Sequence, residues 1–301
     1  EYVLIVTDQG IISMDENLSK LWSYFISNLV DAYVFDVDGD STEEIIVGNA
    51  TIIEVLSINR TIELYHNVSG LVDFLVGDFY GYPGNEYVLV FPNYIEVRSG
   101  SWETIWRQEI DNVTQVLGIQ WNHDSLREIL AVGEYKLLVI DDDGSIIWNY
   151  VFQSTITHVI VSEMNNNELE DIIACTCDNT IWLFMDSAMG KSSREFAKSI
   201  TSVGTGNVDN TMYREILLGF NDKTLLAVNI TLGIANNVSV GSDILAIQCY
   251  NVDLDQEEEI IVGCTEEIVF IDEWNVSWCT GLRGNITSCL LYTSDAADDG
   301  E

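Results

Sequence analysis

Positively charged residues are scarce in this chain of 301 residues, which has 12 Lys and Arg against 49 Asp and Glu and a formal net charge of −37. A surface with this charge repels nucleic acids and anionic lipids, so both are poor partners. Self-repulsion of this size also destabilises a compact fold unless multivalent cations or high salt offset it. The charge therefore directs attention to acidic loops that hold cations.

Proline and helical patterning are also scarce. The two prolines are Pro83 and Pro92, and no linker, low-complexity segment or Pro-rich hinge divides the chain. No amphipathic 3.6-residue period lasts for three turns, whereas Val, Ile, Tyr, Thr and Trp fill short runs broken by Asn, Asp and Gly. This composition predicts one all-β domain.

An acidic residue followed by a short β-branched apolar run recurs at intervals of 42 to 44 residues. We call these acidic residues the anchors: Glu1, Glu44, Glu86, Glu128, Asp171, Glu215 and Glu259. A period near 43 residues is typical of four-stranded propeller blades or of helical pairs, and the residue types favour blades. We therefore predict a β-propeller of about seven four-stranded blades, which also removes exposed sheet edges.

The segment from Val116 to Trp148 illustrates one repeat. We predict strands at VLGIQ, EILAVG, KLLVID and IIWNY, with the second strand buried on both faces and the outer strands alternating more. Tryptophan recurs about 20 residues after four anchors, at Trp22, Trp106, Trp148 and Trp278. We expect these rings to pack between blades rather than to stack on a cofactor.

The propeller is expected to span residues 1–288 as a single domain of a longer polypeptide. The chain opens at an anchor without Met or a leader segment, so we expect a preceding portion. Residues 289–301 begin with CLLYTSDAADD, which looks like the translation of a sequencing-library adapter and therefore predicts a non-native tail. In the competing interpretation, ITSCLLY is the first strand of the seventh blade and closes the ring.

The loop before Glu44 presents carboxylates at alternating positions, and its relative before Glu259 repeats the pattern. Oxygen ligands at positions 1, 3, 5 and 9 of a tight loop suit Ca²⁺, which takes six to eight of them, and position 7 adds its backbone carbonyl or a carboxylate. The predicted ligands are Asp36, Asp38, Asp40, Thr42 and Glu44 in the first repeat and Asn251, Asp253, Asp255, Glu257 and Glu259 in the sixth. A weaker site is expected at Glu163, Asn165, Asn167 and Asp171.

The remaining loops depart further from the pattern. The third repeat has Gln120, Asn122, Asp124 and Glu128, and the fifth has Asn207, Asp209, Thr211 and Glu215. In the second repeat, Tyr80 and Tyr82 separate Asp78 from Glu86, and no metal is expected. In the alternative interpretation, Asp, Asn and Gly simply form turns at these places.

The stretches DVDGDSTEEIIVG and NVDLDQEEEIIVGC resemble the calcium loop of FG-GAP or VCBS-type repeats, the family that includes the integrin alpha-chain propeller. The turns DENLSKLW and DDDGSIIW are similar to the Asp-turn-Trp element of quinoprotein-like propellers. The resemblance implies an extracellular propeller that binds proteins or glycans and is stiffened by Ca²⁺ in its loops.

Nine N-x-S/T triplets support an extracellular or cell-surface glycoprotein independently of that resemblance. They begin at Asn17, Asn49, Asn59, Asn67, Asn112, Asn229, Asn237, Asn275 and Asn285. The cysteines show no zinc or C-x-x-C spacing. We expect Cys175 and Cys177 to be buried on one strand face, and Cys249 and Cys264 to lie on neighbouring strands, where they could be close.

These observations predict a non-enzymatic binding or adhesion module with a protein or glycan ligand. The three histidines, five lysines and seven arginines share no register, and His158 is expected to pack or hydrogen bond. No P-loop, dinucleotide fingerprint or Ser-His-Asp order with its motifs is present. A propeller enzyme, either a polysaccharide lyase or a quinoprotein-like dehydrogenase, is one alternative, and a protein-docking scaffold is another. Exposed Tyr80, Tyr82 and Tyr94 would favour a glycan or peptide contact.

Overall fold

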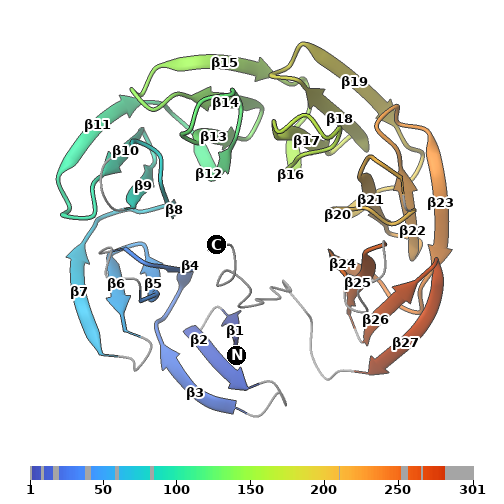
Figure 1. Ribbon diagram of the computed structural model, residues 1–301, viewed down its shortest axis with the longest axis horizontal. Helices are drawn as coiled ribbons and strands as arrows, with labels where there is room; N and C mark the ends of the chain where they lie inside the picture. Colours follow the sequence, from blue (N-terminus) through green and yellow to red (C-terminus); the bar gives the residue numbers. More distant parts are fainter. Residues whose placement is uncertain are drawn as a thin grey trace, which may run out of the picture.

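The computed structural model describes residues 2–7, 10–15, 20–37, 42–57, 61–81, 85–209, 211–251, 257–265 and 267–281. All regular elements in these residues are β-strands, which form seven antiparallel sheets of strands consecutive in the sequence. The sheets stand around a circle as blades, with the first strand of each four-stranded sheet near the centre and the last on the outside (Figure 1). Among the described residues, none forms a helix with the length and hydrophobicity that crossing a bilayer would require.

The blades are numbered in chain order, starting with the first four-stranded sheet. Blade 1 is β4 (Leu29–Phe35), β5 (Glu44–Asn49), β6 (Ile52–Leu56) and β7 (Ile62–Asn67). Blade 2 is β8 (Asp73–Gly77), β9 (Glu86–Phe91), β10 (Tyr94–Arg98) and β11 (Thr104–Glu109). Blade 3 is β12 (Val113–Ile119), β13 (Glu128–Gly133), β14 (Lys136–Ile140) and β15 (Ile146–Val151). Blade 4 is β16 (Ile156–Ser162), β17 (Asp171–Thr176), β18 (Thr180–Met185) and β19 (Gly190–Glu195).

Blade 5 is β20 (Ile200–Gly206), β21 (Glu215–Phe220), β22 (Thr224–Val228) and β23 (Ile234–Ser239). Blade 6 is β24 (Ile244–Tyr250), β25 (Glu259–Cys264), β26 (Glu267–Asp272) and β27 (Asn275–Gly281). Blade 7 has three strands in the described part: β1 (Tyr2–Thr7), β2 (Gly10–Asp15) and β3 (Lys20–Phe25). Since β1 follows the anchor Glu1, it corresponds to a second strand. The predicted non-native tail at 289–301 and the alternative closing strand ITSCLLY both lie outside the described residues.

The predicted all-β propeller with seven blades is confirmed. The anchors mark the same position in successive blades. Six anchors, at residues 44, 86, 128, 171, 215 and 259, begin the second strand of their blades. Second strands such as β9, β13, β17 and β21 are buried along their whole length, whereas outer strands such as β15 and β19 alternate. Both faces of a second strand are covered because the core lies between neighbouring blades.

The recurring tryptophans pack between blades, as predicted. The indole of Trp148 in blade 3 meets Phe184 of blade 4, with 5.2 Å between ring centroids. Trp106 of blade 2 donates from Nε1 to the backbone carbonyl of Asp142 in blade 3, at 2.7 Å. Trp22 packs against the cluster between blades 7 and 1, and the side chain of Trp278 lies outside the described part of the chain.

The cysteine predictions were partly wrong. Cys175 is buried in β17, but Cys177 is exposed because that strand ends at Thr176. Cys249 lies opposite Ile260 and Cys264 lies opposite Ile244, so the two thiols are at opposite ends of the β24–β25 pair. All five cysteines in the described residues are free thiols.

Two Arg–Glu pairs tie consecutive blades together at the residue before the anchor. The two terminal guanidinium nitrogens of Arg214 in blade 5, Nη1 and Nη2, donate to Glu258 in blade 6 at 3.0 and 2.8 Å. Glu258 also accepts from the backbone N–H of Asn207 at 3.1 Å. Blades 3 and 4 repeat this arrangement with Arg127 and Glu170, 2.6 Å apart. Two of the few basic residues therefore hold blades together.

Replacing Glu258 with alanine is expected to lower the free energy of unfolding by about 1–2 kcal/mol. The change leaves Arg214 and the Asn207 N–H without their acceptor, and the half-exposed position limits the loss. Urea unfolding measures it, with Glu109→Ala as the matched control, because Glu109 is 69% exposed and pairs within its own strand. Equal effects of the two substitutions would contradict this role of Glu258.

Candidate metal centres and an inter-blade cavity

The anchor carboxylates are buried and close their own loops. In five blades, one anchor oxygen accepts a hydrogen bond from the backbone N–H seven residues earlier. The pairs are Val37–Glu44 at 3.0 Å, Phe79–Glu86 at 2.8 Å, Trp121–Glu128 at 2.7 Å, Met164–Asp171 at 3.1 Å and Val208–Glu215 at 3.2 Å. The anchor was predicted as a metal ligand, whereas the structure shows that its carboxylate also closes the loop without a metal.

The two loops predicted most strongly to bind Ca²⁺ are described in part. Asp38, Asp40, Asp253 and Asp255 lie outside the described residues. In blade 1, Glu44 is buried, and the carbonyl of Asp36 accepts from the Asn85 side chain of blade 2 at 2.5 Å. This carbonyl therefore ties blade 1 to blade 2.

In blade 6, the predicted ligands Glu257 and Glu259 line a cavity of about 10 Å³ together with Asp272 and Glu273 of the β26–β27 turn. A volume of this size holds about one water molecule or one ion. The lining is acidic, and carboxylate oxygens are ligands that Ca²⁺ takes, although among the described residues the acids whose oxygens lie within 4.8 Å of one another are in blade 3. The structure thus adds two acidic residues to the predicted set.

In blade 3, the Gln120 side chain binds backbone carbonyl groups of its loop, as a cation would. Its amide nitrogen donates to the backbone carbonyls of Asn122, Asp124 and Leu126, at 2.8, 3.0 and 3.3 Å. Carboxylate oxygens of Asp124, Glu128 and Asp141 nevertheless lie within 4.8 Å of one another. Any cation would therefore sit on the carboxylate side, away from Gln120.

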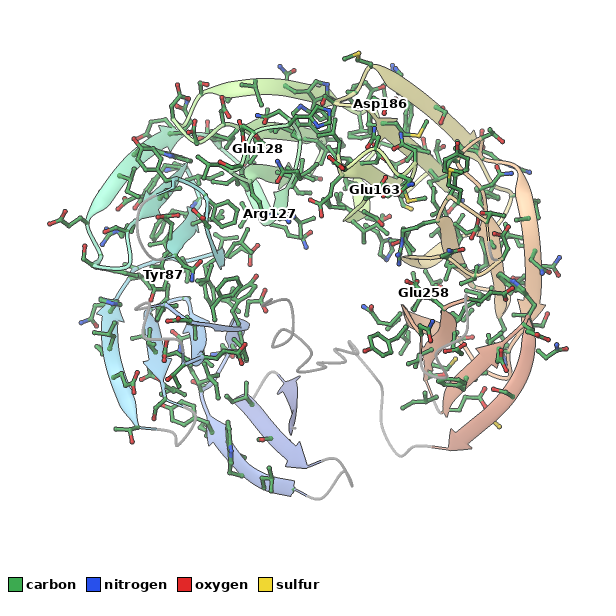
Figure 2. All side chains as sticks on the ribbon, in the orientation of Figure 1. Tyr87, Arg127, Glu128, Glu163, Asp186 and Glu258 are labelled. Atoms are coloured by element: carbon green, nitrogen blue, oxygen red, sulfur yellow. The ribbon has the colours of Figure 1, made fainter. Side chains whose placement is uncertain are left out.

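In blade 4, the weaker predicted site is joined by an acid from the β18–β19 turn. The side-chain amides of Asn165 and Asn167 donate to one oxygen of Asp186, at 2.9 and 2.6 Å, and Glu163 accepts from the backbone N–H groups of both asparagines. Figure 2 labels Glu163 and Asp186 on this blade and Glu128 on its neighbour. The side-chain amide oxygen of Asn165, Oδ1, is buried without a hydrogen-bond partner. Asp171 accepts a hydrogen bond from the backbone N–H of Asp186 at 3.1 Å, so the structure brings the four predicted residues together around Asp186.

Burial raises the pKa of several anchors. Burial raises the pKa of Glu128 to about 7, the Trp121 N–H lowers it, and the Asp124 and Asp141 carboxylates raise it. Burial likewise raises the pKa of Glu215 to about 7 and that of Asp171 to about 6. A bound cation would favour the ionised forms and oppose these shifts.

The turn between the third and fourth strands supplies residues that the sequence analysis did not include. Asp141, Asp186 and Asp272 come from this turn in blades 3, 4 and 6, and lie 13 to 15 residues after their anchors. The Asp-containing turns before tryptophan are visible in the sequence, but their proximity to the loops is not. The available signal was an acid that recurs 13 to 15 residues after the anchor in three repeats.

The inner strands of four successive blades carry a polar residue 13 positions before the anchor, at Asp31, Asp73, Gln115 and His158. Asp73 accepts from the backbone N–H of Val116 in the next blade, at 2.8 Å. Burial lowers the pKa of His158, and a hydrogen bond with the Thr201 backbone of the next blade raises it. His158 is thus a hydrogen-bonding residue, as predicted. Hydrogen bonds of Asp73 and His158 therefore link the inner strands of neighbouring blades.

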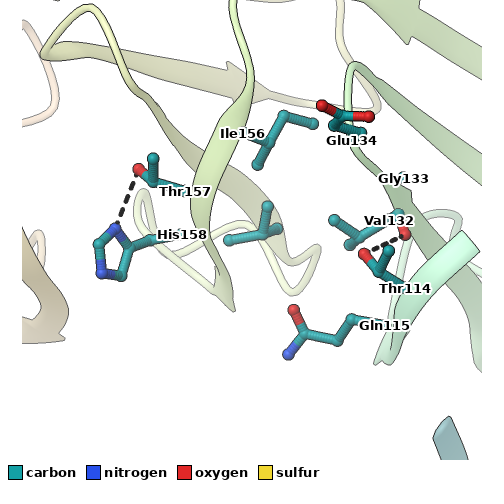
Figure 3. Close-up of a pocket in the computed structure, with 9 residues that line it drawn as sticks. Thr114, Gln115, Val132, Gly133, Glu134, Ile156, Thr157 and His158 are labelled. Carbon is teal, nitrogen blue, oxygen red and sulfur yellow. Dashed lines mark hydrogen bonds between the residues drawn. The ribbon is translucent and has the colours of Figure 1, made fainter. Parts of the chain in front are cut away.

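A cavity of about 200 Å³ opens between blades 3 and 4, beside the inner-strand residues Gln115 and His158 (Figure 3). It is lined by Thr114, Gln115, Val132, Gly133, Glu134, Ile156, Thr157, His158 and Val159. The volume is below the roughly 300–1,000 Å³ of most small-molecule sites. The cavity therefore suits a single side chain better than a cofactor or a substrate.

The predicted aromatic rim is not formed by Tyr94. Its ring stacks on Phe91, with 4.5 Å between centroids, and the Arg107 guanidinium lies 3.5 Å above it. Tyr94 is thus packed within its blade. Tyr80 is half-buried, and Tyr82 lies outside the described residues.

No protein-family model matches the chain, and no curated protein matches it. Among solved structures, it is similar to BBS1N in a mercury-soaked crystal of its complex with ARL6DN, with a TM-score of 0.66 and 11% identity over 86% of this chain and 82% of that chain. The lead-soaked crystal of the same complex gives a TM-score of 0.63 and 10% identity over 85% and 83%. The chain is thus a seven-bladed, propeller-like protein of the same fold as BBS1N. The FG-GAP resemblance rests on its two loops alone.

Proposed function

We propose that this chain is a non-enzymatic propeller that docks a protein partner. The cavity between blades 3 and 4 carries the proposal, because it is the size of a side chain and lies beside the polar inner strands. The similar BBS1N chain is in complex with a protein, ARL6DN, which supports a docking scaffold over an adhesion module.

The proposed partner presents a basic surface. A net charge of −37 attracts cationic proteins and speeds their association at low salt. Glu134 contributes a carboxylate to the cavity, and Gln115 contributes an amide. His158 adds little positive charge at neutral pH, because burial lowers its pKa. An arginine or lysine of the partner fits this set of groups.

Two of the three histidines, His66 and His158, have structural contacts. His66 stacks on Trp102 with 3.7 Å between ring centroids, and His158 hydrogen bonds between blades. No observation favours a lyase or a quinoprotein-like dehydrogenase, so docking without catalysis is the function that we propose.

Ca²⁺ is the proposed stabilising ion, and we place it at the acidic cavity of blade 6, where the sequence pattern of the loop also predicts it. Glu257, Glu259 and Asp272 would hold it, together with the predicted ligands Asp253 and Asp255. The ion would supply positive charge where carboxylates crowd together. The loops it stiffens connect the inner strands to the buried second strands.

Display outside the cell is the proposed location. The N-x-S/T asparagines Asn67, Asn112, Asn237 and Asn275 are exposed, as a glycan acceptor must be. These asparagines lie in blades 1, 2, 5 and 6 or in the connections that follow them, and the Asn112 triplet ends at Thr114, which lines the cavity between blades 3 and 4. A glycan on Asn112 would therefore lie beside the proposed docking position, whereas the other three triplets are distant from it in the sequence.

Site-specific photo-crosslinking tests the docking proposal. A photoreactive phenylalanine analogue replaces Gln115 at the cavity, and as a matched control it replaces Ser193, which is exposed on the outer strand β19. We expect one protein to be crosslinked from position 115 in cells that express the chain, and not from position 193. Crosslinks that are equal from both positions, or absent from both, would overturn the proposal.

A further inference from the structure

Blade 2 has a different kind of site at the position where blades 3, 4 and 6 gather acids. Its β10–β11 turn, residues 99–103, has the same backbone hydrogen bonds as the β14–β15 turn of blade 3. Trp102 donates its N–H to the carbonyl of Ser99 at 2.8 Å, as Gly144 does to Asp141 at 2.9 Å. Ser99 and Ser101 therefore stand where blade 3 has Asp141 and Asp143.

Trp102 holds this turn in a strained conformation. Its φ of 68° matches the left-handed conformation of Gly144, at 84°, which is costly for a bulky residue. Stacking on His66 at 3.7 Å and an edge contact with Tyr87 at 5.1 Å offset the cost. The indole thus packs toward blade 1 and the core and is not among the residues that line the cavity beside the turn.

That cavity has a volume of about 420 Å³, within the usual range for small-molecule sites. Its lining residues, all in the described part of the chain, are Tyr80, Ser99, Gly100, Ser101, Glu103, Thr104 and Ile105. The Ser99 and Ser101 hydroxyls lie 2.9 Å apart, and each hydroxyl is able both to donate and to accept. Tyr80 and Ile105 add apolar surface.

We infer that this cavity binds a neutral saccharide unit. Paired hydroxyls and one carboxylate match the hydroxyl groups of a sugar, while an aromatic ring matches its C–H face. Among the described residues, the lining has no lysine or arginine for an anion, and Glu103 is its single carboxylate where a Ca²⁺ site needs several. This site goes beyond the proposed function and is separate from the cavity between blades 3 and 4.

Saturation-transfer NMR with a panel of methyl glycosides of common hexoses and N-acetylhexosamines tests this inference on the full chain. We expect at least one glycoside to bind, and Ser101→Ala and Glu103→Gln each to weaken it about three- to tenfold, the effect of one lost hydrogen bond. Asp143→Ala and Ser145→Ala are matched controls at the equivalent turn of blade 3, and these are expected to change binding less than twofold.

Three results would overturn the inference. These are no transfer to any glycoside, transfer that survives both blade 2 substitutions, and binding of N-acetyl-arginine amide in place of the sugars. Circular dichroism of each variant shows whether the fold is retained, and Tyr80→Leu provides a third, hydroxyl-independent variant. Because none of these residues lines the cavity between blades 3 and 4, crosslinking from position 115 remains an independent test of docking.

Discussion

Replacing Asp73 with asparagine is expected to stabilise the protein by about 1–3 kcal/mol at pH 8. Burial raises the pKa of Asp73 from 3.8 to about 7, with the Val116 N–H lowering it and Asp31 raising it. At pH 8 the folded protein therefore holds a buried carboxylate at a cost of up to roughly 4 kcal/mol. Asparagine keeps an acceptor for the Val116 N–H without the charge, although the buried amide has a desolvation cost of its own.

The sign of the pH dependence follows from the raised pKa. Between about pH 4 and pH 7, folded Asp73 keeps a proton that the unfolded chain releases, so the wild-type protein loses stability as the pH rises. The advantage of Asp73→Asn therefore grows from about pH 4 to about pH 7 and then stays level.

Urea unfolding in EGTA at pH 4.5, 6, 7.5 and 8.5 measures this effect. Asp111→Asn is the matched control, because Asp111 is exposed and its loss should not change the pH profile. A difference between Asp73→Asn and wild type that is constant with pH would show that the carboxyl does not titrate as described.

Adding Ca²⁺ to EGTA-treated protein is expected to raise the unfolding midpoint by roughly 5–10 °C. Ligand at 100 times its dissociation constant stabilises the folded state by about 2.7 kcal/mol per site, and 1 kcal/mol shifts the midpoint of a domain of this size by roughly 2–4 °C. Mg²⁺ is expected to shift the midpoint less, because it holds its own waters and demands octahedral geometry.

Variants locate the ion. Asp272→Asn and Glu257→Gln, which remove carboxylates from the 10 Å³ cavity of blade 6, are expected to remove at least half of the Ca²⁺ effect. Glu195→Gln, an exposed residue on β19, is the control and should respond like the wild type. If Ca²⁺ and Mg²⁺ give equal shifts, or if Asp272→Asn responds fully, blade 6 is not a specific site.

The repeat made the fold predictable from the sequence. Anchors every 42 to 44 residues set the blade number, and apolar runs such as EILAVG marked the buried second strands, because both patterns are local. The site was less predictable because its parts come from separate segments. Asp186 reaches the Asn165 loop only through the folding of blade 4.

The partners of some polar and aromatic side chains were also not predictable from the sequence. Gln120 resembles a weak ligand in a linear pattern, but its amide is a donor that bonds to the loop carbonyls. Tyr94 looked available to a ligand, whereas Arg107 on the neighbouring strand covers its ring. Which partner a polar or aromatic group selects depends on the neighbouring strand, and the sequence alone does not specify that geometry.

The most direct test of docking is the affinity of the full chain for the protein crosslinked from position 115. Calorimetry compares the wild type with Glu134→Lys at the cavity and Glu195→Lys on the outer strand, two changes that alter the net charge equally. The docking account predicts at least about tenfold weaker binding for Glu134→Lys and less than about twofold for Glu195→Lys, because a close charge pair outweighs a distant one. Equal weakening by both would reduce the interaction to non-specific attraction and would contradict docking at the cavity.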